Sequence, residues 1–137
     1  MDTIRTSWHD PQTKHILHME FYEGWTWTDY TTTHEPEFEL IRELNHPVVI
    51  IQTAVTPRAS RPPGGNAFAV IRAMVERTPK QVIGVYVVNT NMFVGEIVKI
   101  FGRISTRRGL EISSTTTFEA AVKRAEQQID EKLKKAS

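Results

Sequence analysis

The sequence predicts a single α/β domain with a mixed, mostly parallel sheet of about five strands, in the order ββαβαβαβα. Two apolar, β-branched runs, at residues 48–55 and 82–88, have the composition of strands that are buried on both faces of a sheet. Helical patterns lie between and after these runs, and strands that alternate with helices are typical of a parallel sheet. Because 137 residues suffice for one continuous core, we expect one domain over residues 1–137.

The amino-terminal part of the sequence predicts a hairpin. Residues 4–9 and 15–22 have the composition of strands. Asp10 and Pro11, which lie between them, are residue types that favour a turn. The second segment alternates so that one face is apolar and the other is mixed, which is typical of an antiparallel edge. We therefore expect the first strand to join the sheet antiparallel at an edge.

The first helix is predicted from Thr26 onward. Thr26 and Asp29 have the spacing of a capping box. Residues with a helical period follow at Trp27, Tyr30, His34, Phe38, Ile41 and Asn45. Pro36 interrupts this pattern, and because proline removes a helical hydrogen bond, we expect it to kink the helix or divide it in two.

Three more helices and a short strand follow. The helix after the first central run opens at Asn66, and the next is capped by Asn91. A short strand is predicted at residues 110–113, and Thr116 or Thr117 caps the last helix. Because crossovers between parallel strands are almost always right-handed, the strands after the first helix should form a parallel sheet.

Composition excludes several classes of function. The chain has no cysteine, which excludes disulfides, thiolate metal sites and a cysteine nucleophile. A net charge of +1 gives no field that would attract nucleic acid. The start of the chain does not resemble a signal peptide, and no apolar run reaches the roughly 20 residues that a membrane helix needs. We expect a soluble, cytoplasmic protein with neither nucleic-acid nor membrane partners.

No pattern in the sequence predicts catalysis. Serine, histidine and aspartate are scattered, and no nucleophile elbow, phosphate loop or dinucleotide fingerprint occurs. His15 and His18, the closest histidine pair, would point to opposite faces of a strand and could not share a metal ion. We therefore predict a protein that is not an enzyme and that uses no cofactor or metal.

The segment after the first central run is the main candidate site, because ligands often bind at the carboxyl ends of strands in α/β proteins. Gly64, Gly65 and Asn66 precede a helix and Arg58 and Arg61 lie upstream, so this segment predicts either an anion site or a tight turn with an asparagine cap. Asn89 and Asn91 follow the second central run in the same way. Trp25 and Trp27 flank the first helix, where either both attach it to the sheet or one lies on the surface.

The order of elements, the segment Phe21-Tyr22-Glu23-Gly24-Trp25-Thr26-Trp27 and the apolar strand leading to Pro63-Gly64-Gly65 together resemble the STAS superfamily. This is the domain of sulfate-transporter tails and anti-sigma-factor antagonists, and the chain is most similar to small free-standing bacterial proteins of the antagonist type. In the antagonists, a partner kinase phosphorylates a serine or threonine after the third strand. The matching residues, Pro63, Gly64 and Gly65, carry no hydroxyl, and Ser60 is the nearest one.

The resemblance implies a non-enzymatic regulatory or protein-interaction module that lacks the usual phosphoacceptor. Its partner would be another protein, a kinase-like regulator for example, or a second copy of the chain, bound through residues 54–68 and 89–93. The predicted partner-binding or anion-binding residues are Arg58, Ser60, Arg61, Gly64, Gly65, Asn66, Asn89 and Asn91. The alternative is an α/β protein that binds a small molecule or an anion, and an enzyme of unrecognised type is a distant third.

Overall fold

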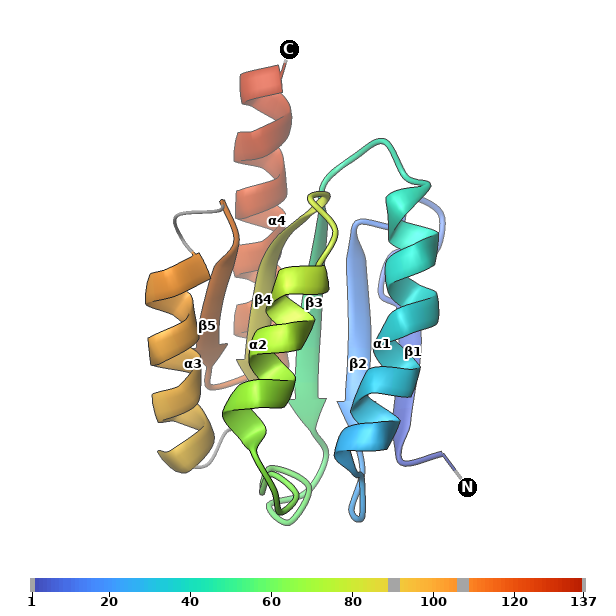
Figure 1. Cartoon of the computed structure of the whole chain (residues 1–137). Helices are drawn as coiled ribbons and strands as arrows, with labels where there is room; N and C mark the ends of the chain where they lie inside the picture. Colours follow the sequence, from blue (N-terminus) through green and yellow to red (C-terminus); the bar gives the residue numbers. More distant parts are fainter. Residues whose placement is uncertain (1, 89–91, 106–108, 137) are drawn as a thin grey trace.

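The computed structural model describes residues 2–88, 92–105 and 109–136 and has an α/β fold (Figure 1). The order of strands and helices is the predicted one. The bounds are Ile4–Trp8 (β1), Ile16–Phe21 (β2), Trp27–Arg42 (α1), Val48–Ala54 (β3), Ala67–Arg77 (α2), Val82–Val88 (β4), Met92–Ser105 (α3), Glu111–Thr115 (β5) and Phe118–Ala136 (α4).

The five strands form one mixed sheet in which each strand pairs with the next one along the chain. β1 is antiparallel to β2, whereas β2, β3, β4 and β5 are parallel to one another. This confirms the predicted mixed sheet, its antiparallel amino-terminal edge and the adjacent, parallel placement of the two apolar runs as β3 and β4.

The side chain of Asp10 builds the turn between β1 and β2. Its carboxylate accepts hydrogen bonds from the Thr13 hydroxyl at 2.6 Å and from the backbone N–H groups of His15 and Ile16 at 2.9 Å each. Partial burial would raise the pKa of Asp10, but these hydrogen bonds outweigh burial and hold the pKa below its usual value. The ionised carboxylate therefore fixes the hairpin.

Helices α1, α2 and α3 cover one face of the sheet, and α4 lies on the other (Figure 1). Successive parallel strands step across the sheet in one direction, and connections of this kind have the same hand in nearly all proteins. The three connecting helices therefore lie on the same side. We call the two sides the three-helix face and the α4 face.

The first half of β3 is buried on both faces of the sheet. Val48 and Ile50 belong to the core of the three-helix face, whereas Val49 and Ile51 belong to the core of the α4 face. All four side chains are at most 1% exposed. The predicted burial of the first apolar run is thus confirmed for residues 48–51, whereas residues 52–54 are half-buried and Val55 is 43% exposed.

Helix α1 begins at the predicted capping box and continues past its proline. The Thr26 hydroxyl accepts from the Asp29 backbone N–H at 3.1 Å, and the Asp29 carboxylate accepts from the Thr26 N–H at 3.0 Å. The helix includes Pro36, so the predicted division there is wrong. His34 and Phe38, on either side of the proline, are both buried, and this burial offsets the hydrogen bond that proline removes.

Two other predicted caps are confirmed. The Asn66 side chain accepts from the Ala69 backbone N–H at 3.1 Å, and the Thr117 hydroxyl accepts from the Ala120 N–H at 3.1 Å. The predicted cap at Asn91 lies outside the described residues. Within residues 2–88, 92–105 and 109–136, no helix is both long and apolar enough to cross a membrane.

We predict that Gly102→Ala destabilises the protein, although alanine is the better helix former. A Cβ atom built on Gly102 of α3 meets the carbonyl oxygen of Ile112 in β5 at 2.6 Å. The helix would have to move away from the strand, at a cost of about 1–3 kcal/mol. Urea unfolding measures this loss.

Gly64→Ala is the matched control for this substitution. A Cβ atom at Gly64 meets nothing within 4 Å, so the free energy of unfolding should change by less than about 0.5 kcal/mol. A Gly102→Ala protein as stable as the wild type would contradict the close packing of α3 on β5.

Candidate functional site

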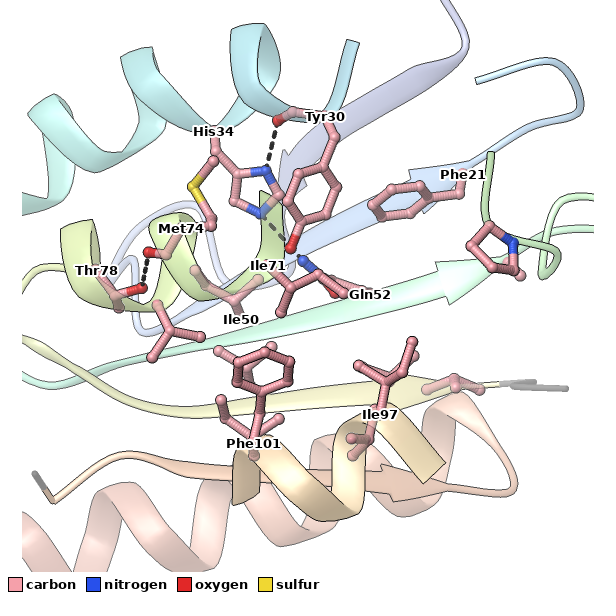
Figure 2. A pocket seen from close by; sticks show the side chains of 18 of the residues that line it. Phe21, Tyr30, His34, Ile50, Gln52, Ile71, Met74, Thr78, Ile97 and Phe101 are labelled. Atoms are coloured by element: carbon pink, nitrogen blue, oxygen red, sulfur yellow. Dashed lines mark hydrogen bonds between the residues drawn. The ribbon is translucent and has the colours of Figure 1, made fainter. Parts of the chain in front are cut away.

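A cavity of about 130 Å³ lies between the helices of the three-helix face and the sheet (Figure 2). Ile71 and Met74 of α2 line it, as do Ile97 and Phe101 of α3. Most other lining residues are also aliphatic or aromatic, and none of the lining residues is Asp, Glu, Lys or Arg. The cavity is therefore an apolar site without a formal charge in its wall.

Aromatic side chains form the wall near the start of α1. The rings of Trp25 and Trp27 are 5.1 Å apart, edge to face, and Trp27 contacts Tyr30 in the same manner at 5.4 Å. Trp25 also packs edge to face on Phe21 of β2 at 5.0 Å. Edge-to-face pairs are a favourable aromatic geometry. Both tryptophans are half-buried and attach the helix start to the sheet, as in the first of the two predicted arrangements.

Residues 55–66, which we call the β3–α2 loop, contribute another wall. Ala59, Ser60 and Pro62 line the cavity. The Trp25 indole N–H donates to the Ala59 carbonyl at 2.7 Å, and the Ser60 hydroxyl donates to the Pro57 carbonyl at 2.6 Å. The loop is thus joined to the same aromatic group that begins α1.

The structure brings one predicted site residue, Ser60, to the cavity. The other predicted residues of the β3–α2 loop are exposed and do not line it: Arg58, Arg61, Gly64, Gly65 and Asn66. Gly65 has a φ of +107°, which favours glycine, and Asn66 caps α2. These two residues therefore form the tight turn with an asparagine cap. Asn89 and Asn91 lie outside the described residues.

A polar group lies within the apolar lining and consists of the buried Tyr30 and His34 and the half-buried Gln52 (Figure 2). His34 Nδ1 lies 2.7 Å from the Tyr30 carbonyl oxygen and must carry the proton, because a carbonyl only accepts. Its Nε2 then accepts from the Gln52 side-chain amide at 3.1 Å. The Tyr30 hydroxyl also forms a hydrogen bond with Gln52. We call this set the Tyr30–His34–Gln52 group.

Burial keeps both titratable members of this group uncharged near neutral pH. Burial raises the pKa of Tyr30 to about 12, with a smaller opposing effect from the hydrogen bond with Gln52. Burial lowers the pKa of His34 to about 4, and the hydrogen bond to the Tyr30 carbonyl opposes this shift in part. The cavity therefore offers neutral hydrogen-bonding groups and no electrostatic attraction for an ion.

Trp27, another residue that lines the cavity, carries a further polar atom. Its Nε1 is buried, and it has no hydrogen-bond partner among the described residues. Buried tryptophan N–H groups usually find an acceptor. The arrangement can therefore enclose an apolar molecule and donate one hydrogen bond to it.

The sequence analysis did not predict that Tyr30, His34 and Gln52 line a cavity. The helical period placed Tyr30 and His34 on the buried face of α1, but it gave no sign that they border a cavity. Gln52 offered the better signal, because it follows four buried aliphatic residues in a central strand. An amide next to such a core needs hydrogen-bond partners, and the buried His34 provides one.

The described histidines outside the cavity do not form a metal cluster. The His15 ring contacts the His46 ring at 4.3 Å, whereas His18 Nε2 forms a 2.9 Å hydrogen bond with the Thr53 hydroxyl. In the described part of the chain, no three His, Cys, Asp or Glu residues are grouped so that they could hold a metal ion.

We predict that acidification destabilises the protein in a window that His34 sets. Its pKa is about 4 in the folded protein against an ordinary value of 6.5, so between these pH values the unfolded chain binds a proton that the folded protein does not. The free energy of unfolding should therefore fall by about 3 kcal/mol as the pH falls through this window. Urea unfolding at several pH values measures the change.

His34→Gln removes this titration, and its stability should depend much less on pH in the same window. His46→Gln is the control for loss of an imidazole outside the cavity, and it should retain the fall seen in the wild type. If the wild type and His34→Gln lost stability in parallel, the pH dependence would have another origin.

Comparison with known proteins leaves the chain without a match: no family model, curated protein or solved structure is significantly similar to it. The resemblance to the STAS superfamily therefore stays a prediction.

Proposed function

We propose that this chain is a non-enzymatic binding protein whose cavity receives a small, mostly apolar molecule. The observation that carries this proposal is the combination of an apolar lining with a few buried neutral polar groups, which is typical of small-molecule sites. An engineered protein cavity of about 150 Å³ binds benzene. A volume of about 130 Å³ therefore suits a molecule built around one small ring.

The hydrogen bonds of His34 favour binding over catalysis. Nδ1 is engaged by the Tyr30 carbonyl and Nε2 by the Gln52 amide. A general base needs a free lone pair within reach of its substrate, whereas here the lone pair of Nε2 already accepts a hydrogen bond from Gln52. This arrangement supports a structural role for His34, which is to hold α1 in register with β3.

A second candidate function is recognition of a protein partner at the β3–α2 loop. The observation that favours it is that one loop both lines the cavity, through Ala59 and Ser60, and carries the exposed Arg58 and Arg61. A ligand that contacts the inner residues would change the position of the outer ones. The resemblance to anti-sigma-factor antagonists supports a regulatory partner at this place, either a kinase-like protein or a second copy of the chain.

We predict that toluene raises the melting temperature of the wild-type protein, because a ligand that binds only the folded state stabilises it. Ile71→Phe should abolish this rise, since the larger side chain occupies part of the cavity. The same substitution at Ile100, which is 41% exposed and does not line the cavity, should leave the rise intact. Thermal unfolding with increasing toluene concentration measures all three proteins. Equal behaviour of Ile71→Phe and wild type would contradict binding in this cavity.

For the second candidate function, we predict that replacing both Arg58 and Arg61 by alanine weakens binding of a protein partner. The fold should remain intact, since exposed substitutions usually change stability by less than about 0.5 kcal/mol. The difference from the wild type should shrink with added salt, because exposed charges are screened beyond roughly 10 Å at 0.1 M ionic strength. Partner binding is measured by calorimetry at low and high salt.

Arg72→Ala is the control, because this arginine is also exposed but lies on α2, where it pairs with Glu76. Unchanged partner binding by the double variant at low salt would place the interaction surface elsewhere. If the double variant unfolds, the two arginines instead serve to hold the β3–α2 loop against the rest of the protein.

A further inference from the structure

Trp27 lines the cavity and carries a buried hydrogen-bond donor. Its ring packs edge to face against both Trp25 and Tyr30, with interplanar angles of 89° and 81°. Its Nε1 is buried and, among the described residues, has no acceptor. Because a buried donor without an acceptor is unfavourable, a ligand that brings an acceptor gains more here than it would at an exposed donor.

Charged ligands do not suit this cavity. The lining contains no acidic or basic side chain apart from the imidazole of His34. Burial lowers the pKa of that imidazole to about 4, so it is neutral at pH 7. A carboxylate or an ammonium group would therefore be buried without a counterion, which is strongly unfavourable.

We propose that the natural ligand is an uncharged molecule with an apolar body and one hydrogen-bond acceptor, such as a ketone, ester or ether oxygen, that accepts from Trp27 Nε1. This inference rests on the proposed small-molecule function and adds the chemical class of the ligand. The apolar body lies among the aliphatic side chains of α2 and α3, represented by Ile71 and Ile97. The His34 N–H and the Gln52 amide are already engaged within the Tyr30–His34–Gln52 group, whereas the Trp27 N–H is a buried donor with no acceptor among the described residues.

Four probes of nearly equal size and shape test this class: cumene, acetophenone, benzoate and 1-phenylethylammonium. Each has a phenyl ring with one branched substituent, and only the polarity and charge of the substituent differ. Calorimetry or quenching of tryptophan fluorescence gives the dissociation constants at pH 7. We expect cumene and acetophenone to bind, and both ions to bind at least about a hundredfold more weakly than acetophenone.

The decisive variant is Trp27→Phe, which removes the N–H donor and keeps an aromatic ring. We expect it to weaken acetophenone binding about three- to tenfold, the range of one hydrogen bond, and to change cumene binding less than twofold. Cumene thus controls for the altered shape of the cavity. Trp8→Phe is the matched control variant, because Trp8 packs on the same core but does not line the cavity. It should change neither affinity.

The outcomes separate this inference from the proposed function. If Trp27→Phe weakens cumene and acetophenone equally, the indole only packs against ligands and the inference is wrong, while small-molecule binding stands. If benzoate binds as tightly as acetophenone, the cavity accepts charge and the inference is also wrong. If neither uncharged probe binds the wild-type protein, the proposed function fails and the inference fails with it.

Discussion

The strand order decides where the cavity lies. Each parallel strand pairs with the next one along the chain, so the three connecting helices share one face of the sheet (Figure 1). Trp25 just before α1, Trp27 at its start and Phe101 of α3 all line the cavity on this face. On the α4 face, by contrast, Ala121 and Ala125 let a single helix pack directly on the strands.

The Tyr30–His34–Gln52 group gives α1 a defined position on the sheet. Apolar contacts alone would allow the helix to slide, whereas the hydrogen bonds of His34 to the Tyr30 carbonyl and to Gln52 on β3 require one register. Burial keeps both His34 and Tyr30 neutral, because it lowers the pKa of the imidazole and raises that of the phenol. This side of the cavity is therefore rigid and uncharged. The Trp27 indole packs against Tyr30 on the same side.

The sequence predicted the fold far better than the site, for physical reasons. The strand at residues 48–51 could be predicted because it lies in an apolar run. The turn at Asp10 and the helix caps at Thr26 and Asn66 could be predicted because they depend on local chemistry. The predicted division of α1 at Pro36 is wrong because burial of the helix outweighs a local preference. The cavity was not predicted, since periodicity shows which side chains face inward but not how closely helices from distant segments pack. The prediction placed the site at the exposed loop with Arg58 and Arg61, which do not line the cavity. Gln52 in β3 does line it, and a polar residue in a central strand was the better indication of its position.

The central claim is that the cavity holds a neutral ligand against the indole of Trp27. Its most direct test is a proton–nitrogen correlation spectrum of the three tryptophan indole groups, with the Trp27 resonance assigned from Trp27→Phe. We expect saturating acetophenone to move the Trp27 indole proton to lower field, as formation of a hydrogen bond requires, and to leave the Trp8 resonance in place. A Trp27 resonance that stays in place at saturation, or that cumene shifts equally, would show that the ligand does not accept a hydrogen bond from this indole.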